Sequence, residues 1–234
     1  MSGIVDFHSH ILPGIDDGSE SLQESIAMLR TEAAQGIGHV VATPHFYPRY
    51  ETPEDFLHKR DQAEAVLLSA MKREKGLPQL SVGAEVYFFR GISESDFLPQ
   101  LTIRGKRCIL IEMPAAPWSD SMYRELEAIW RRRGITPVIA HIDRYIRPFR
   151  TYKIPERLAQ MPVLVQANAS FFLESRTRRM ALKMLRADQI QLLGSDCHNL
   201  DSRPPQLGSA LETIEAHLGR QFLERIQAYQ EDVL

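Results

Sequence analysis

The feature that most constrains the fold of this chain is a short segment near its start, Asp6-Phe7-His8-Ser9-His10, which closes an apolar stretch. Side chains alternate between the two faces of a strand, so His8 and His10 point the same way. Paired imidazoles favour a divalent transition metal. The segment therefore predicts a strand that carries two metal-binding groups at its carboxyl end.

Strand and helix patterns alternate along the rest of the chain, which indicates an α/β fold with a mainly parallel sheet. We predict seven short apolar strands, at Gly3–His8, Gly38–Thr43, Gln79–Glu85, Cys108–Glu112, Thr136–His141, Val163–Asn168 and Ile190–Ser195. Helical periodicity predicts helices at Leu22–Gln35, Pro53–Arg73, Ser121–Arg133, Arg176–Ala187, Gln206–Leu218 and Arg220–Tyr229. A capping box of Ser21 and Glu24 opens the first helix, and Gly36 and Gly134 suit the left-handed position that follows a helix.

Composition bounds the class of protein. The 234 residues contain no low-complexity linker and are 44% hydrophobic, so we expect a single domain over residues 1–234. With 28 basic and 30 acidic residues, the net charge of −2 gives no support to a nucleic-acid surface. No apolar run approaches the roughly 20 residues that span a bilayer, and no signal-peptide pattern is present. Cys108 and Cys197 form no disulfide framework, so we expect a cytoplasmic protein without membrane insertion.

Polar groups that bind metals or anions close one predicted strand after another. They are His8 and His10, His45, Glu85, Glu112, His141, Asn168, Asp196 and His198. In barrels built of βα units, active sites lie at the carboxyl ends of the strands. Five of the eight histidines fall in this set, so their joint placement predicts one shared site.

A single histidine after a strand is more often a buried, hydrogen-bonded side chain than a metal ligand. Three carboxylates make the metal-ligand interpretation more favourable. Glu85, Glu112 and Asp196 follow apolar residues in stretches that should be buried. An unpaired buried carboxylate is costly or becomes protonated. A shared cluster of cations explains all three.

Eight short motifs occur in order along nearly the whole chain: His8-Ser9-His10, Asp16-Asp17-Gly18, Ala42-Thr43-Pro44-His45, Gly83-Ala84-Glu85, Ile111-Glu112, Ile139-Ala140-His141-Ile142-Asp143-Arg144, Gln166-Ala167-Asn168 and Ser195-Asp196-Cys197-His198-Asn199. This ordered set resembles the polymerase and histidinol phosphatase (PHP) family, and most closely its bacterial capsule and exopolysaccharide tyrosine phosphatases. The resemblance implies a distorted seven-stranded (β/α) TIM-like barrel, the PHP fold. It also implies three divalent metal ions, usually Mn with Fe, Zn, Mg or Co as alternatives. The implied reaction is hydrolysis of phosphotyrosine on a protein, the tail of a bacterial tyrosine kinase of capsular polysaccharide synthesis.

Carried over residue by residue, the resemblance also implies roles within the site. One metal would take His8, His10, Glu85 and Asp196, a second Asp17, His45 and His198 with Asp16 as the alternative to Asp17, and a third Glu85, Glu112 and His141. Arg144 and Arg203 would bind the phosphate. Asp143 occupies a position where the family usually has Glu, so the negative charge is kept but the side chain is shorter. Several divalent ions held close together can activate water and neutralise a transferring phosphoryl group, so no side-chain nucleophile is required.

Alternatives remain open at this point. Cys197 and Arg203 have the Cys-x5-Arg spacing of cysteine-dependent tyrosine phosphatases, although residues 198–202 contain no glycine to fold backbone N–H groups around an anion. A PHP phosphoesterase acting on a small metabolite such as histidinol phosphate or on a nucleic-acid end, and a non-catalytic metal-binding scaffold, are further readings. Four aromatic residues either contact a substrate phenyl ring or pack loops: Phe46, Tyr47, Tyr50 and Trp118. The sequence identifies no general acid and leaves the oligomeric state open.

Overall fold

A computed structural model of the chain describes residues 4–146 and 153–234, so Gly3, at the start of the first predicted strand, lies outside the described residues. The strands in the described residues are β1 (Val5–Ser9), β2 (His39–Ala42), β3 (His45–Phe46), β4 (Gln79–Val82), β5 (Glu85–Tyr87), β6 (Cys108–Glu112), β7 (Thr136–Ile139), β8 (Leu164–Asn168) and β9 (Leu192–Gly194). Neighbouring strands pair in parallel, in the orders β1-β2-β4 and β3-β5-β6-β7-β8-β9. The expected α/β class with a parallel sheet is confirmed.

The two sheets form one curled ring because β2 leads into β3 and β4 leads into β5. Pro44 has no N–H and interrupts the ladder between β2 and β3. Across the same break, the N–H of Gly83 donates to the carbonyl of Ala42, and the N–H of Glu85 donates to the carbonyl of Pro44. The seven predicted strand positions thus follow one another around the ring, and two of them are filled by a pair of short strands.

The ring closes between the first and the last strand. Ser9 forms a parallel bridge with Cys197, and the N–H of Asp196 donates to the carbonyl of His8 over 2.8 Å. This closure brings the beginning and the end of the chain to the same edge of the ring.

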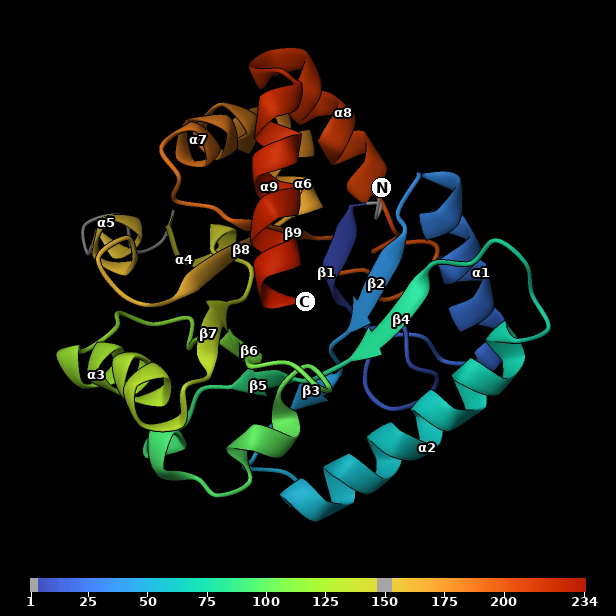
Figure 1. The fold of residues 1–234 in the computed structure, drawn as a ribbon, viewed down its shortest axis with the longest axis horizontal. Helices are drawn as coiled ribbons and strands as arrows, with labels where there is room; N and C mark the ends of the chain where they lie inside the picture. Colours follow the sequence, from blue (N-terminus) through green and yellow to red (C-terminus); the bar gives the residue numbers. More distant parts are fainter. Residues whose placement is uncertain (1–3, 147–152) are drawn as a thin grey trace.

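Most helices cover the outside of the ring, whereas the last helix lies across one of its openings (Figure 1). In the described residues they are α1 (Leu22–Ala34), α2 (Pro53–Met71), α3 (Asp120–Ala128), α4 (Asp143–Ile146), α5 (Ile154–Leu158), α6 (Ala169–Leu173), α7 (Ser175–Arg186), α8 (Leu207–Leu218) and α9 (Arg220–Val233), with 3₁₀ turns η1 (Ile92–Glu94) and η2 (Leu98–Leu101) and a π-helical turn η3 (Ile129–Arg133). All six predicted helices are present. The sequence did not predict α4, α5 and α6, because elements of four or five residues are too short to show a helical period. Over the two described ranges, no helix is long and apolar enough to cross a membrane.

The expected caps are largely confirmed. The N–H of Glu24 donates to Ser21 Oγ over 3.2 Å at the start of α1. The reciprocal half of the capping box differs, because the carboxylate of Glu24 accepts from the N–H of Glu20, one residue before the cap. Gly36 and Gly134 have φ angles of +79° and +59°, the left-handed conformation that glycine adopts without strain.

Strand alternation divides the apolar side chains between two clusters. On β6, Ile109 and Ile111 pack with residues of the surrounding helices, whereas Cys108 and Leu110 belong to a smaller cluster inside the ring. Glu112 continues the inner row at the carboxyl end of the strand. The ring therefore buries apolar groups in its interior and presents polar groups at its carboxyl end.

The last helix links the two ends of the chain. The side-chain amide of Gln230 on α9 donates to the carbonyl of Val5 over 2.7 Å and accepts from the N–H of Val5 over 3.0 Å. In Figure 1, α9 lies beside β1. These contacts hold β1 in place at the opening of the ring.

Candidate metal centre

Glu85 lies at the centre of a buried cluster of imidazoles at the carboxyl end of the ring. Its Oε2 is 3.1 Å from His8 Nε2, 3.3 Å from His10 Nε2 and 3.1 Å from His45 Nδ1. Its Oε1 is 2.8 Å from His141 Nε2. Burial alone would raise the pKa of Glu85, but the imidazoles hold that pKa well below its usual value. Glu85 is therefore a carboxylate shared by four rings.

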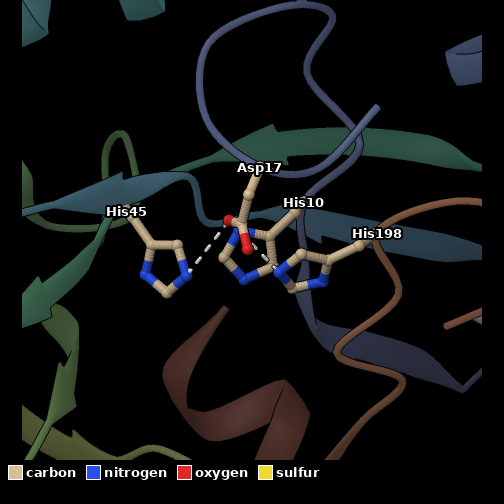
Figure 2. Close-up of side chains that lie close together, drawn as sticks. All are labelled: His10, Asp17, His45 and His198. Atoms are coloured by element: carbon tan, nitrogen blue, oxygen red, sulfur yellow. Dashed lines mark ion pairs between the residues drawn. The ribbon is translucent and has the colours of Figure 1, made fainter. Parts of the chain in front are cut away.

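A second group of side chains lies beside His10 on the solvent side of the cluster. Asp17 Oδ1 lies 3.5 Å from His45 Nε2 and 3.5 Å from His198 Nε2 (Figure 2). The ring of His10 packs against that of His198, with centroids 3.9 Å apart. One ligand atom from each of these four residues lies within 4.8 Å of the others. This grouping is close enough for one ion to contact all of them.

A third group forms around Glu112. Its Oε1 lies 3.6 Å from His141 Nε2, and Glu112, Glu85 and His45 also offer ligand atoms within 4.8 Å of one another. His141 follows β7 with a φ of +31°, a conformation that residues other than glycine rarely adopt. The backbone therefore turns at the point where the strand delivers its imidazole.

Asp196 completes the cluster from the last strand. Its Oδ1 is 3.5 Å from both His8 Nε2 and His10 Nε2, and Asn168 Nδ2 donates to its Oδ2 over 2.8 Å. Burial would raise the pKa of Asp196, but the two imidazoles hold it well below its usual value. All nine residues expected as metal ligands thus lie together: His8, His10, Asp17, His45, Glu85, Glu112, His141, Asp196 and His198.

Unsatisfied atoms indicate that this donor set fits metal ions. His45 Nδ1, His198 Nε2 and Asp196 Oδ1 are buried and form no well-aligned hydrogen bond with any described residue. Their charged neighbours Glu85, Asp17 and Arg203 lie close but do not supply that geometry, and a buried polar atom without a good hydrogen bond costs free energy. Burial and the neighbouring His10 lower the pKa of His198 to about 4, so its ring is neutral at neutral pH, the form that binds metals. Imidazole nitrogens combined with carboxylate oxygens suit divalent transition metals.

Two arginines reach the open side of the cluster. Arg144 Nη1 donates to Glu112 Oε1 over 3.1 Å, and its Nη2 donates to Asp196 Oδ2 over 3.0 Å. Arg203 Nη2 lies 2.8 Å from Asp196 Oδ1. The two side chains are 40% and 37% exposed, so both guanidinium groups face solvent as well as the cluster. Asp143 does not hold Arg144, because its Oδ1 accepts from the N–H of residue 168.

The family model for capsular polysaccharide synthesis, CpsB/CapC, matches residues 4–233. The chain belongs to this family. The tyrosine-protein phosphatase CpsB of Streptococcus agalactiae serotype V is 31% identical over 241 residues, which cover 96% of this chain and 97% of the relative. The family expected from the ordered motifs is thereby confirmed.

Solved structures share the fold of this CpsB/CapC protein. One of the crystal structures of YwqE from Bacillus subtilis and CpsB from Streptococcus pneumoniae, described as unique metal-dependent tyrosine phosphatases, matches with a TM-score of 0.83 at 23% identity, covering 99% of this chain and 96% of the other. Histidinol phosphate phosphatase from Lactococcus lactis, solved with zinc, L-histidinol and phosphate, matches with a TM-score of 0.58 at 15% identity, covering 95% and 93%. At these identities the likeness shows a common fold, which agrees with the expected PHP-type barrel.

Side chains behind the cluster fix the orientation of its imidazoles. Gln166 Oε1 accepts from His8 Nδ1 over 3.2 Å and from the N–H of His141 over 2.7 Å. The hydroxyl of Tyr145 lies 3.3 Å from His141 Nδ1. Each contact leaves the other ring nitrogen facing the cluster, as is typical of metal-binding histidines. Neither role was predicted from the sequence, where the one available signal is that Gln166 shares a strand face with Asn168.

Asp16 and Asp17 are adjacent in the sequence but contact different groups. Asp16 Oδ2 is 2.7 Å from His10 Nδ1 and accepts from the N–H of His45, and its Oδ1 accepts from the N–H of Gly18. Both oxygens of Asp16 are therefore engaged outside the cluster. Of the two, it is Asp17 that directs its carboxylate toward the imidazoles of His45 and His198.

Two buried acidic residues, Asp6 and Glu32, lie beside Cys197 and apart from the expected ligands. Asp6 accepts from the N–H groups of His8 and Ser195 and from the Ser195 hydroxyl, so it ties β1 to the segment after β9. Glu32 on α1 is fully buried, its carboxyl group lies beside that of Asp6, and neither of its oxygens has a well-aligned hydrogen bond in the described parts of the chain. Burial and the neighbouring Asp6 raise the pKa of Glu32 to about 10. Glu32 is therefore a neutral carboxylic acid at neutral pH.

The geometry disfavours the thiolate alternative. Cys197 is fully buried, and its Sγ lies near Asp6 and Glu32 rather than in the metal cluster. Burial raises the pKa of the Cys197 thiol well above its usual value. In the loop that leads to Arg203, the side-chain oxygen of Asn199 accepts from the N–H groups of residues 201, 202 and 203. These groups are not free to surround a phosphate.

The four aromatic residues left open by the sequence divide into two pairs. Phe46 and Trp118 are buried in the apolar core, so for these two the packing role is correct. Tyr47 lies beside the cluster, with its ring centroid 4.9 Å from that of His45. Its hydroxyl donates to Glu112 Oε2 over 3.2 Å. Tyr50, which is 79% exposed, lies in the same loop.

Proposed function

We propose that this CpsB/CapC protein is a metal-dependent protein-tyrosine phosphatase. The observation that carries the proposal is the convergence of Arg144 and Arg203 on Asp196, at the open side of a buried cluster of imidazoles and carboxylates. Such a site offers cationic groups to a phosphate and keeps its own carboxylates ionised. The Streptococcus agalactiae relative, which matches over almost the whole length, is named a tyrosine-protein phosphatase, and this supports the same reaction here.

The residues of the cluster would hold three divalent ions. The ligand sets are His8, His10, Glu85 and Asp196 for one ion, Asp17, His45 and His198 for a second, and Glu85, Glu112 and His141 for a third, and the grouping of these atoms supports the assignment. Mn is the expected metal, with Fe, Zn, Mg or Co as alternatives. When bound, the ions supply Lewis acidity and activate water for attack on phosphorus. Asp16 is assigned to orienting His10, since both of its oxygens are already engaged.

Arg144 and Arg203 would grip the phosphate. They lie on two different loops, after β7 and after β9, and reach the cluster from two directions. A phosphate accepts guanidinium N–H groups as the carboxylates that these arginines now contact do, and it carries more charge. The arginines would therefore orient the phosphoryl group and offset the charge that develops on it during transfer.

Tyr47 would contact the phenyl ring of the substrate. Its ring forms a wall next to His45 at the edge of the cluster, where an aromatic side chain can pack against it. Burial and the nearby Glu112 raise the pKa of Tyr47, so its hydroxyl stays protonated and donates to Glu112. Phenol has a pKa near 10, much lower than that of an alcohol, so the departing phenolate has less need of a general acid.

The natural substrate in this proposal is the tail of a bacterial tyrosine kinase that governs capsular polysaccharide synthesis. The family model, which describes capsular polysaccharide synthesis, supports that setting. A cytoplasmic location is part of the proposal. Cys108 and Cys197 are both buried and unpaired, which is compatible with a reducing compartment.

The test compares kcat/KM on matched peptides that carry phosphotyrosine, phosphoserine or phosphothreonine, with histidinol phosphate as a fourth substrate. We expect the phosphotyrosine peptide to be preferred by at least about tenfold, equivalent to about 1.4 kcal/mol in the barrier. Equal rates on the three peptides would indicate a general phosphoesterase. A preference for histidinol phosphate would favour the metabolite phosphatase, and metal binding without turnover would favour the scaffold.

A further inference from the structure

A cleft of about 620 Å³ adjoins the metal cluster. Its walls include Tyr47, Tyr50, Tyr87 and Phe89, and Arg49 lies at its rim. The ring centroid of Tyr47 is 5.5 Å from that of Tyr87 and 6.2 Å from that of Tyr50. The volume lies within the range of ligand-binding clefts and exceeds what one phenyl ring would fill. The cleft therefore has room for more of a substrate than its phosphotyrosine ring.

The cleft continues the strands that carry the expected ligands. β3 and β5 pair in parallel, with His45 opposite Glu85. Side chains two residues apart on a strand share a face, so Tyr47 follows His45, and Tyr87 follows Glu85, on the side of the cluster. Along both strands, the aromatic side chains that line the cleft therefore come directly after the expected metal ligands. A molecule whose phosphate lies at the cluster thus extends directly into the cleft.

Exposure and charge at the rim favour a polypeptide with acidic character. Tyr50 is 79% exposed, which leaves a large aromatic side chain free for contact with a partner. Arg49 is also exposed and forms no ion pair with any residue in the described ranges. An unpaired cation beside apolar walls attracts a carboxylate. An aromatic wall with a cation at its edge suits a segment that combines an apolar side chain with an acidic one.

Building on the proposed function, we infer that the cleft binds the residues that flank the phosphotyrosine in the substrate chain. An aromatic or large aliphatic side chain lies between Tyr47, Tyr50 and Phe89, and an acidic side chain lies against Arg49. An extended chain advances about 3.3 Å per residue, so positions one to three residues from the phosphotyrosine reach the cleft. The cleft thereby selects among phosphotyrosine sites by their neighbouring sequence.

The test uses the metal-loaded protein and a series of phosphotyrosine peptides with glycine flanks. A single Phe is moved through the three positions on each side, and p-nitrophenyl phosphate serves as a substrate without flanks. Peptides with a non-hydrolysable phosphonate in place of the phosphate report binding by fluorescence anisotropy, independently of turnover. Tyr50→Ala and Phe89→Ala are compared with Trp130→Ala, which truncates an exposed aromatic residue that does not line the cleft.

We expect Phe at the best position to lower KM, and the Kd of the phosphonate peptide, by about five- to tenfold, as burial of one such side chain allows. Tyr50→Ala and Phe89→Ala should remove this preference, and Trp130→Ala should keep it. All three variants should hydrolyse p-nitrophenyl phosphate within about twofold of the wild-type rate, because the cleft lies outside the cluster. Arg49→Glu should raise KM for a peptide with a flanking Asp and lower it for one with a flanking Lys.

Two results overturn the inference: equal KM for all flanks in the wild-type protein, or a flank preference that persists in both Tyr50→Ala and Phe89→Ala. In either case hydrolysis of the glycine-flanked peptide leaves the proposed phosphatase activity standing. Failure of the wild-type protein to hydrolyse any phosphotyrosine peptide overturns both proposals.

Discussion

Asp16 Oδ2 lies 2.7 Å from His10 Nδ1, on the side of the imidazole that faces away from the cluster. The same oxygen accepts from the N–H of His45 over 2.9 Å, so Asp16 holds two members of the cluster from outside. The next residue, Asp17, directs its carboxylate toward the imidazoles of His45 and His198. Two adjacent carboxylates in one loop therefore have different environments, and they should respond differently to mutation.

The first prediction compares Asp16→Asn with Asp17→Asn. Loss of the charge behind His10 in Asp16→Asn should weaken metal affinity about 10–100-fold, the usual effect of removing a partner of a metal-binding histidine. Asp17→Asn should lower metal affinity further and reduce the metal content by one ion per chain, because it removes a ligand. Elemental analysis after dialysis against graded free Mn measures both. A larger loss in Asp16→Asn than in Asp17→Asn would reverse the two assignments.

Removal of divalent ions should abolish hydrolysis and lower the thermal unfolding temperature, because the carboxylates of Glu85 and Asp196 then lose cationic partners in a buried site. Adding Mn back should restore both properties. Activity and calorimetry before and after chelation provide the measurement, and Glu85→Gln is the matched variant that should stay inactive after Mn is returned. Unchanged turnover in protein shown to be free of metal would contradict the proposal.

Arg203→Ala and Arg144→Ala should each lower kcat/KM on an aryl phosphate by about 10²–10³-fold, the scale of losing one charge-stabilising group. Bound metal should remain unchanged in both variants. Arg203→Lys is the control, because it restores the charge without the planar fork and should recover only part of the loss. Competitive inhibition by inorganic phosphate should weaken in parallel. Wild-type kcat/KM in both alanine variants would remove the arginines from phosphate binding.

Cys197→Ser should keep most of the wild-type activity, since the thiol lies near Asp6 and Glu32 and not among the expected ligands. Some stability should be lost, because a hydroxyl replaces a thiol in a fully buried position. Cys108→Ser, at the other buried cysteine, provides the comparison. A folded, fully metal-loaded Cys197→Ser protein without activity would falsify the metal mechanism in favour of a thiolate.

Glu32 should make the protein less stable as pH rises. Its pKa is raised from 4.5 to about 10 in the folded protein, so between these values the unfolded chain releases a proton that the folded chain retains. Folding stability should therefore fall with increasing pH across this window, by at most about 1.4 kcal/mol per pH unit. Glu32→Gln removes this titration and should be similar in stability to the wild type near pH 5 but more stable at pH 9.

Denaturant unfolding of both proteins at pH 5, 7 and 9, at the same free Mn concentration, measures the difference in unfolding free energy. Asp6 neighbours Glu32, so its titration changes with that of Glu32 and is counted with it. Titrating groups away from this pair are common to both proteins and cancel in that difference. A difference that does not change with pH would mean that Glu32 is ionised in the folded protein.

The ligand-bearing strands could be predicted because the expected ligands at strand ends follow apolar runs, and parallel strands send their carboxyl ends to one side. Glu112 after Cys108–Ile111 is the clearest case. Gln166 and Tyr145 could not be recognised in the same way. His8, the partner of Gln166, lies on the first strand, and that adjacency arises only when the ring closes. Tyr145 lies only four residues after its partner His141, but the chain turns at His141 with a positive φ and leaves no periodic pattern from which this contact could be predicted.

Loops set the second limit on prediction from sequence. Asp16 and Asp17 are adjacent, and the register of a loop leaves no periodic pattern that would tell them apart. The aromatic cleft could be predicted only in part from the sequence, because Tyr87 and Phe89 extend an apolar strand and resemble core residues. Both side chains stay partly exposed because they line the cleft beside the loop that carries Tyr50, and this placement is visible only in the structure.

The closure of the ring has a consequence for when the site can form in the cell. Gln230 on the last helix holds Val5 on the first strand, and the expected ligands His8 and His10 face Asp196 across the seam. During synthesis, β1 leaves the ribosome long before β9, and the imidazoles of His8 and His10 lack Asp196 until most of the barrel has been made. The first metal position is therefore completed late, after the seam between β1 and β9 has formed. Chains that stop before β9 lack Asp196 and His198, and chains whose seam is open cannot bring Asp196 to His8 and His10.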